Sequence, residues 1–234
     1  MYAFDNIICT IPARSGSKRL PNKNTMILAN KPMIAYSIEA AIHTQLFQDI
    51  YVCTDDPIIA SIAQDYGAKV PFLMEPDLCG DLVASHIPCQ EMASFLSKEG
   101  KVIDSMLCLQ PTSPLRSVED ITKGVRKFFE EKLDFLVSVT PIDPHYFHWA
   151  LQSNNEGFWE MFFGTTYMLE RPLLPSVYRP NGSIKIAKLE KLKEVGNFFG
   201  KRLGVIETPE ERSIHVATQF EFKFCEFLLN SQRS

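Results

Sequence analysis

Cationic side chains are concentrated in one short loop near the start of the chain. The loop runs from Pro12 to Lys31 and follows an apolar run that predicts a buried strand. Arg can bind phosphate oxygens through two parallel hydrogen bonds, and Lys supplies a mobile point charge. Gly16 lets the backbone approach an anion, and successive N–H groups there can form an anion-binding nest. The loop therefore predicts a site for an anionic small molecule. Its cations are Arg14, Lys18, Arg19 and Lys23.

Two common nucleotide-binding patterns are missing from this loop. The Walker A pattern GxxxxGK[ST] is absent, and so is the dinucleotide fingerprint GxGxxG. Neither a P-loop nor a dinucleotide site is supported. The alternative is a solvated basic loop without a ligand, but Gly16 and the preceding strand favour a binding site.

Length, composition and charge limit the class of protein. The chain has 234 residues, of which 45% are hydrophobic, so it suits one large domain with a sizeable core. The net charge of −4 provides no overall positive field for nucleic acid. The six cysteines form no CxxC pair and are expected to be reduced and buried. No signal peptide is visible, nor any apolar run of the roughly 20 residues that span a bilayer, so we expect a cytoplasmic protein without a membrane partner.

The first 140 residues alternate short apolar runs with amphipathic segments. Strands buried on both faces and separated by helices predict a mostly parallel sheet, in a doubly wound α/β domain. Ligands of such sheets bind beyond the carboxyl ends of the strands. The strands expected are Asn6–Ile11, Asp49–Cys53, Ala68–Pro71, Ser105–Leu109 and Phe135–Thr140. The helices expected are Pro32–His43, Pro57–Tyr66, Ala84–Lys98 and Val118–Glu130.

The alternation stops after Pro141. Residues 144–171 are too aromatic for a solvated loop and too irregular for another strand–helix unit. We interpret them as a small inserted excursion, within a single domain of residues 1–234, that packs on another subunit. The alternative is a satellite hydrophobic cluster within one chain. The later elements expected are two strands, Ser183–Ala187 and Leu203–Ile206, and a helix, Gln219–Leu229.

Four motifs together resemble one enzyme family. They are the loop Ile11-Pro-Ala-Arg-Ser-Gly-Ser-Lys-Arg-Leu-Pro-Asn-Lys-Asn24, Cys53-Thr-Asp-Asp56, Leu109-Gln-Pro-Thr-Ser-Pro-Leu-Arg116 and Tyr178-Arg-Pro-Asn-Gly182. The first resembles the IPARxxSKxxxxKN signature of the acylneuraminate cytidylyltransferases, the CMP-sialic acid synthetases. The motifs occur in the family's order and spacing, and the match extends from residue 7 to 229. The resemblance implies a nucleotide-diphospho-sugar transferase-like fold and a homodimer formed through residues 144–171.

The resemblance also implies roles for individual residues. Arg14, Lys18 and Lys23 match triphosphate-binding residues, and Ser17 belongs to the same signature. Arg14 and Lys23 are the expected catalytic residues, with Lys23 stabilising transition-state charge. Three further residues match the surroundings of the nucleotide: Asn24, Asp81 and His86, although the family usually has Ser where His86 stands. Three match the sugar side: Gln110 facing the sugar, Arg171 near its acidic group, and Asn181 in the segment that closes the pocket.

The implied reaction joins CMP from CTP to an acidic nine-carbon 2-keto sugar. An anomeric hydroxyl attacks the α-phosphorus, and pyrophosphate leaves. Such a step needs positioning and charge neutralisation more than covalent help. A divalent cation, Mg²⁺ or Mn²⁺, would normally bridge the phosphates and help to activate the hydroxyl. Sialic, legionaminic and pseudaminic acids all remain open as the sugar.

Several residues depart from the family pattern. The family normally ends with [ST]-[IV]-D-I-D-T, whose two Asp residues bind Mg²⁺, whereas this chain has Ser213-Ile-His-Val-Ala-Thr218. Mg²⁺ requires hard oxygen ligands, which His215 and Ala217 do not supply. His215 is the remaining candidate for a metal ligand, although a lone His is more often structural. Glu75 replaces an Arg that commonly contacts the nucleotide, and Lys185 replaces a usual aromatic residue.

Three hypotheses about function follow. The chain is an active sugar cytidylyltransferase, a weak or inactive homologue that binds nucleotide or a partner, or an enzyme of the same fold that uses another sugar or nucleotide. The basic loop and Gln110 favour the first hypothesis. His215 and Ala217 favour the second.

Overall fold

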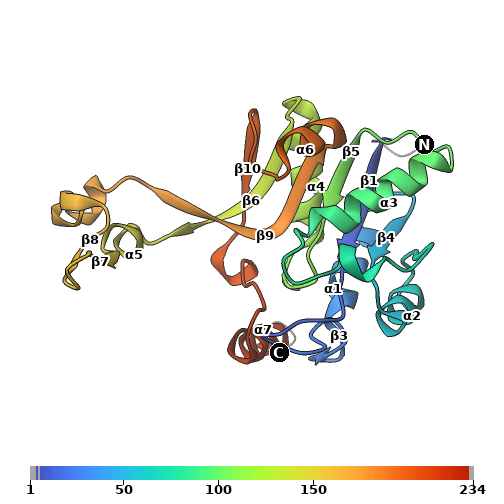
Figure 1. Ribbon diagram of the computed structural model, residues 1–234, viewed down its shortest axis with the longest axis horizontal. Coiled ribbons are helices and arrows are strands. Elements are labelled where there is room, and N and C mark those ends of the chain that lie inside the picture. Colours follow the sequence, from blue (N-terminus) through green and yellow to red (C-terminus); the bar gives the residue numbers. More distant parts are fainter. Residues whose placement is uncertain (1–3, 5, 232–234) are drawn as a thin grey trace.

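A six-stranded sheet forms the centre of the molecule (Figure 1). The computed structural model describes residue 4 and residues 6–231, so the remaining residues of the expected domain 1–234 lie outside this description. The strand order is β10-β6-β9-β5-β1-β4. All neighbours are parallel except for β9, which runs antiparallel to both β5 and β6. The strands are β1 (Ile7–Pro12), β4 (Ile50–Cys53), β5 (Ser105–Cys108), β6 (Phe135–Ile142), β9 (Val177–Lys188) and β10 (Leu203–Glu207).

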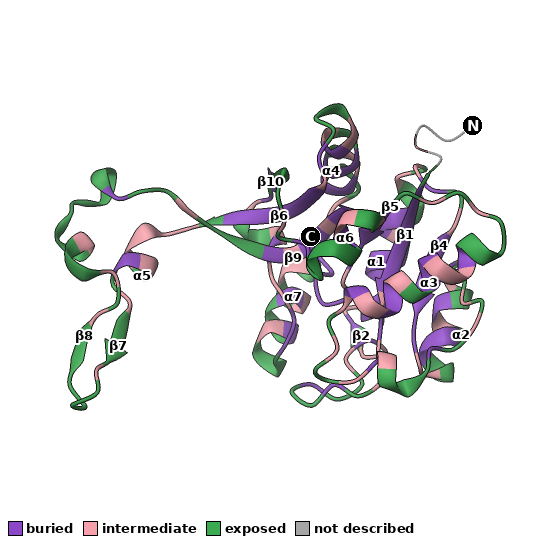
Figure 2. Ribbon diagram, turned by 45° about the horizontal axis from the view of Figure 1, so that its top comes forward, coloured by how far each residue is buried: buried purple, intermediate pink, exposed green. Residues whose placement is uncertain are grey.

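Helices cover both faces of this sheet, which confirms the predicted α/β fold. Helices α1 (Met33–His43), α2 (Pro57–Asp65) and α4 (Val118–Glu130) contribute apolar side chains to the core on one face. Helices α3 (His86–Lys98) and α6 (Leu189–Val195) do so on the other. Figure 2 shows the sheet buried between these two layers.

Local sequence signals explain where several helices begin. Asp56 accepts hydrogen bonds from the backbone N–H groups of Ile58 and Ile59, and Pro57 occupies the first turn of α2, where its missing N–H costs nothing. Ser117 and Asp120 form a reciprocal capping box at the start of α4. These caps satisfy backbone donors that no helical carbonyl can reach. They set the helix starts next to the strands that carry the site.

The C-terminal helix α7 (Gln219–Ser231) covers a third, smaller apolar cluster. Phe222 and Cys225 of α7 pack with Leu28 and Met33, next to the short hairpin formed by β2 (Ile27–Leu28) and β3 (Lys31–Pro32). Glu221 accepts hydrogen bonds from the backbone N–H groups of residues 217 and 218, which fixes the segment before the helix. This packing holds the segment 213–218 against the basic loop.

Residues 144–171 lie on an arm that projects from the body (Figure 1). The far ends of β6 and β9 pair as a two-stranded ribbon from residues 139–142 to 177–180, and the ribbon leads to the arm. Its short elements are α5 (Pro144–His148), β7 (Leu151–Ser153), β8 (Trp159–Met161), and the 3-10 turns η2 (Gly164–Met168) and η3 (Arg171–Leu173).

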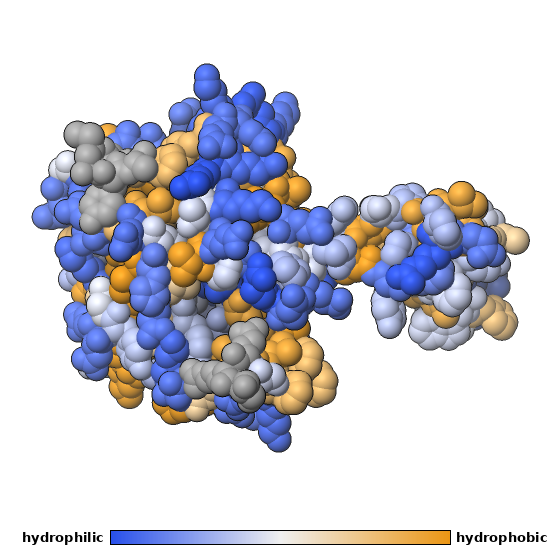
Figure 3. All heavy atoms as spheres, turned by 180° about the vertical axis from the view of Figure 1, so that it is seen from behind, coloured by the Kyte–Doolittle hydropathy of each residue, from blue (hydrophilic) through white to orange (hydrophobic). Residues whose placement is uncertain are grey.

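The arm buries few of its aromatic side chains. Phe147 and Phe163 stack with ring centroids 4.2 Å apart. Tyr146 and Trp159, in contrast, are 86% and 71% exposed, and apolar residues show at the arm's surface in Figure 3. Figure 2 likewise shows mostly exposed residues on the arm. The arm therefore offers a large apolar surface that its own chain does not cover.

Most predicted elements are confirmed within one or two residues. The strand predicted at Ala68–Pro71 is wrong, because only an isolated bridge between Tyr51 and Lys69 forms there. The last strands extend further than predicted, since β6 and β9 continue into the ribbon of the arm. Helix α3 begins at His86 rather than Ala84 because residues 79–84 form a loop beside the site.

All six cysteines are free and buried, as the sequence predicts. Burial raises the pKa of the Cys79 thiol to about 11 and that of Cys225 to about 12. Within residues 6–231, no helix has the length and apolar character that a membrane span requires.

Candidate functional site

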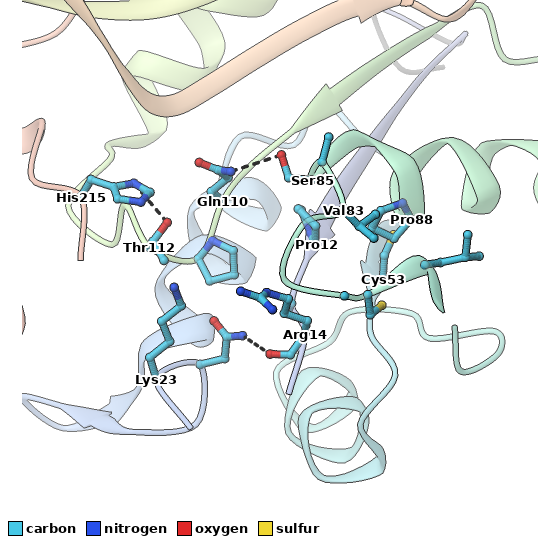
Figure 4. Close-up of a pocket in the computed structure, with 17 residues that line it drawn as sticks. Pro12, Arg14, Lys23, Cys53, Val83, Ser85, Pro88, Gln110, Thr112 and His215 are labelled. Carbon is cyan, nitrogen blue, oxygen red and sulfur yellow. Dashed lines mark hydrogen bonds between the residues drawn. The ribbon is translucent and has the colours of Figure 1, made fainter. Parts of the chain in front are cut away.

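A cavity opens where β1, β4 and β5 end (Figure 4). Pro12 ends β1, Cys53 ends β4, and Gln110 follows β5, so the cavity lies at the edge of the sheet where ligands of this architecture bind. Figure 4 shows Arg14, Lys23, Thr112 and Gln110 gathered around a common space. The sheet thus brings together residues from the first, second and third predicted motifs.

Two of the predicted cations are neutralised by an acid from another loop. Asp81 forms ion pairs with Arg14 and with Lys18, the latter over 2.9 Å. Hydrogen bonds from Lys18, and to a lesser extent from Arg14, hold the pKa of the exposed Asp81 carboxyl below its usual range. Arg14 also donates a hydrogen bond to the carbonyl of Gly16, which ties the guanidinium to the turn of its own loop. Asp81 was predicted beside the nucleotide, and the structure pairs it with two of the cations that were predicted to bind phosphate.

Lys23 lines the same cavity and stands in a positively charged environment. Burial is the main cause that lowers the pKa of its ammonium group. The nearby positive charges of Arg14 and Arg19 lower this pKa further. No ion pair of Lys23 is found among residues 6–231. A half-buried ammonium beside other cations is stabilised by an incoming anion. Its position therefore fits binding to a polyphosphate.

Asn24 and Ser17 complete the basic loop. Asn24 is buried, lines the cavity, and donates a hydrogen bond from Nδ2 to the carbonyl of Arg14 over 3.0 Å. Ser17 is also buried, and lines a neighbouring hollow together with Gly16 and Lys18. Lys18 of the loop lines the hollow, whereas Arg14 and Lys23 line the cavity.

Gln110 stands at the opposite side of the cavity. Its Nε2 donates a hydrogen bond to Ser85 Oγ over 3.2 Å (Figure 4). Gly182 of β9 lies so close that a Cβ atom there would come within 2.7 Å of Gln110 Oε1. Gly182 also has a φ of +73°, which glycine adopts without strain. The positive φ favours glycine beside the predicted sugar-facing amide, and a larger residue there would also displace the end of the Gln110 side chain.

Arg116 supports Gln110 from behind. It is buried, and donates three hydrogen bonds to neutral acceptors: the Gln110 carbonyl over 2.6 Å, Ser37 Oγ over 2.6 Å, and the Ser183 carbonyl over 2.9 Å. Burial lowers the pKa of its guanidinium to about 10, so the side chain is still charged at neutral pH. Arg116 therefore connects helix α1, strand β9 and the loop that carries Gln110.

His86 lies beside the cavity without lining it. It is buried as the first residue of α3 and stands edge-on to Phe198, with ring centroids 6.0 Å apart. Burial, then the charge of Lys185, lower the pKa of its imidazole. The preceding residue, Ser85, lines the cavity instead.

Asn181 and Arg171 do not reach this cavity in their own chain. Asn181 is buried, and its Nδ2 donates to Thr208 Oγ1 and Ser213 Oγ, so its side chain joins β9 to the segment after β10. Arg171 lies on the arm, where it forms an ion pair with Asp143 over 3.0 Å. Both remain predictions as substrate-binding residues, but neither lines the cavity.

His215 occupies the place where the resemblance implies a metal-binding carboxylate. Its Nδ1 lies 3.2 Å from Thr112 Oγ1 within hydrogen-bonding distance (Figure 4). Burial, then the charge of Lys23, lower the pKa of the imidazole to about 4, so it is neutral at pH 7. Ala217, the second replaced position, is buried.

These residues do not fit a Mg²⁺ ion held by the protein. Glu221 is the acid whose charge raises the pKa of His215. Its Oε2 already accepts hydrogen bonds from the backbone of Ala217 and from Thr218. In the described part of the chain, no three His, Cys, Asp or Glu side chains are grouped as a metal site would need. An imidazole, a hydroxyl and an engaged carboxylate are a poor donor set for a hard cation.

Several site residues were not singled out from the sequence. Ser85, Thr112 and Arg116 contact the cavity or its boundary, and the last two lie inside the octapeptide already quoted. That motif was the available signal for them. Glu75, singled out for its reversed charge, is exposed before the 3-10 turn η1 (Pro76–Leu78) and does not line the cavity.

The fold resembles that of CMP:2-keto-3-deoxy-manno-octonic acid synthetase solved with CTP, with a TM-score of 0.74, 16% identity, and coverage of 97% of this chain and 99% of the other. Pseudaminic acid cytidylyltransferase of Campylobacter jejuni is 30% identical over 94% of this chain and 95% of its own length. CMP-N,N'-diacetyllegionaminic acid synthase of Legionella pneumophila is 37% identical over 83% of each chain.

The cytidylyltransferase family model matches residues 8–150, which is more than half of the chain. The protein therefore belongs to the cytidylyltransferase family. The matched region contains the basic loop, the loop of Asp81 and the octapeptide.

Proposed function

We propose that this protein transfers CMP from CTP to a nonulosonic acid and releases pyrophosphate. The observation that carries the proposal is the cavity itself, in which cations of the loop after β1 lie across from Gln110 after β5. One side suits a polyphosphate, and the other presents an amide that can bind sugar hydroxyls. The named activities of the Campylobacter and Legionella relatives support the same reaction class.

The residues contribute charge and position to this reaction. The anomeric hydroxyl oxygen of the sugar forms a bond to the α-phosphorus and releases its proton to solvent as the bond to the pyrophosphate oxygen breaks. Arg14, Lys18 and Lys23 neutralise the charge that develops on the departing pyrophosphate. Asp81 holds Arg14 and Lys18 in place until phosphate oxygens replace its carboxylate. Asn24 and Ser17 position the loop around the nucleotide.

Pyrophosphate release tests the proposal directly. The protein is incubated with CTP and, in separate reactions, with N-acetylneuraminic, N,N'-diacetyllegionaminic and pseudaminic acid, each with Mg²⁺ or Mn²⁺ supplied. We expect release with one of the acids and no comparable release with CTP alone. Equal release with and without every acid would contradict the proposal.

A second candidate function is nucleotide binding without efficient turnover. The observation that favours it is the pair His215 and Ala217, which stand at the positions of the expected carboxylates, with His215 Nδ1 facing Thr112 Oγ1 instead of a metal. Calorimetric titration with CTP separates the two functions when combined with the release assay. Tight CTP binding without turnover of any of the three acids would favour the binding protein.

We further propose that residues 144–171 form a homodimer interface. The exposed aromatic surface of the arm supports this assembly, because large apolar patches on projecting segments are typical of subunit contacts. Arg171 can serve a sugar site only in another copy, since in its own chain it lies on the arm. Light scattering at micromolar concentration tests the assembly, and a monomer would contradict it.

The six unpaired cysteines fit a reducing compartment. We therefore expect the reaction to take place in the cytoplasm. Fractionation of cells that make the protein would check this expectation, and recovery outside the cytoplasmic fraction would contradict it.

A further inference from the structure

Lys185 lies on the central strand β9, outside the set of residues that line the cavity. It pairs in register with Cys108 of β5 and Val137 of β6, both in the apolar cluster on the α3 side of the sheet. The neighbouring residues Ile184 and Ile186 belong to the core of the opposite face. Because side chains alternate along a strand, Lys185 points toward α3 and the end of β5.

The ammonium group of Lys185 has no acidic partner. Its Nζ lies 5.6 Å from the ring centroid of Phe198, a buried residue that also contacts His86. Among residues 6–231, no carboxylate forms an ion pair with it, and its ammonium donates no hydrogen bond. A ring face offsets only part of the cost of removing an ammonium from water. A half-buried cation in this state is stabilised by an anion from outside the chain.

The position of Lys185 indicates which anion this is. A Cβ atom at Gly182, three residues earlier on β9, would meet Gln110, and Gln110 donates a hydrogen bond to Ser85 just before α3. The positive charge of Lys185 lowers the pKa of both His86 and His215, which flank this region. Lys185 therefore lies on the Gln110 side, whereas Arg14, Lys18 and Lys23 stand on the phosphate side. In a reaction between CTP and a sugar acid, the second anion is the sugar carboxylate.

We propose that Lys185 binds the carboxylate of the sugar acid. The inference rests on the proposed transfer of CMP to a nonulosonic acid. Lys185 acts in its own chain, unlike Arg171, which is engaged by Asp143 on the arm. The carboxylate replaces the ring of Phe198 as the main partner of the ammonium.

Direct binding provides the test. Each of the three acids is titrated calorimetrically into the protein saturated with CTP, for the wild type and for Lys185→Met, Lys185→Arg and Lys193→Met. Met keeps the length and apolar stem of the side chain, and Arg keeps the charge. Lys193 on α6 is exposed and makes no ion pair within the described residues, so Lys193→Met controls for the loss of one positive charge.

We expect Lys185→Met to weaken binding of the accepted acid by roughly ten- to hundredfold, the usual range for a hydrogen bond to a charged group. Lys185→Arg should recover most of the affinity, and Lys193→Met should match the wild type. The CTP affinity should stay the same in all four proteins. Unchanged binding of the acid to Lys185→Met would overturn the inference.

The methyl ester of the accepted acid separates a carboxylate contact from a general effect on the pocket. The wild type should bind the ester much more weakly than the acid, whereas Lys185→Met should bind the two with similar affinity. Equal losses for acid and ester on substitution would overturn the inference. If acid binding depends on Lys185 but no pyrophosphate is released, the inference holds and the proposed function fails. If none of the acids binds to the wild type, both fail.

Discussion

The arm and the basic loop both present groups that the rest of the chain satisfies only in part, but the groups differ: apolar side chains on the arm and cations on the loop. In the body, large aromatic side chains such as Phe128 and Phe135 are almost fully buried, whereas Tyr146 and Trp159 on the arm are mostly exposed. The loop after β1, in turn, gathers cations for which the chain provides Asp81 as the partner. The arm lacks apolar contacts, and the loop lacks negative charge. The difference indicates that a protein surface completes the first region and a small anion the second.

Removing the ammonium of Lys23 should have the largest effect on activity. We expect Lys23→Ala to reduce kcat by roughly 10²–10³, because one charge aimed at a developing anion has about this value in a dry site. CTP affinity measured by titration should fall far less. Steady-state kinetics of pyrophosphate release provide the measurement.

Lys69→Ala is the matched control for that change, because Lys69 pairs with Asp49 away from the cavity and should leave kcat unaltered. If Lys23→Ala keeps near wild-type turnover, the assignment of transition-state charge to Lys23 is wrong.

Polar substitutions on the arm should weaken self-association rather than folding. Phe158 and Trp159 are both mostly exposed, so replacing both with Ser removes apolar surface without opening a cavity. We expect the dimer to dissociate at roughly 30- to 100-fold higher protein concentration, since interface aromatics often contribute about 2 kcal/mol or more. Light scattering over a dilution series would measure this.

Phe220→Ser on α7 is the control, because Phe220 is 78% exposed but belongs to the body. Similar dissociation in both variants would remove the distinction between the arm and other exposed apolar residues.

A methyl group at Gly182 should disturb the sugar side of the cavity. We expect Gly182→Ala to lower kcat/KM for the sugar acid by about tenfold, because the new Cβ displaces the Gln110 amide. Gly196→Ala is a close match, since Gly196 has φ of +72° but no atom within 4 Å of its Cβ position. Both variants should lose stability from strain, but only Gly182→Ala should lose activity. An equal activity in the two variants would show that Gln110 tolerates displacement.

The smallest effect concerns the pH dependence of stability. His215 titrates at a pKa of about 4 in the folded protein and 6.5 in the unfolded chain, so the unfolded chain takes up its proton first as pH falls. The contribution of neutral His215 is present above pH 6.5 and is lost as pH falls toward 4. We expect the Tm of the wild type to fall further between pH 7.5 and 5 than that of His215→Gln. Parallel Tm curves would show that His215 is not protected from protonation.

The sequence predicted the body better than the arm, for physical reasons. Strands such as Ile50–Cys53 are apolar throughout and lie between helices, so their burial follows from the pattern alone. The basic loop was also predictable, because loops after parallel strands meet at one edge of the sheet. The exact partners were not, since Asp81 and Arg14 are 67 positions apart and their contact depends on the tertiary fold. Likewise, neither the ribbon of β6 and β9 nor the buried contacts of Asn181 follow from local periodicity.

Because every cysteine is buried, we expect the native thiols to react slowly with thiol-specific reagents. A cysteine introduced at Ser153, which is exposed on β7, would be the preferred target of a maleimide or nitroxide reagent without removal of native thiols. Spectroscopic distances between such labels would then report where the arm of one molecule meets another, in solution and during catalysis. Burial of the native thiols thus allows the position of the arm to be measured by site-specific labelling.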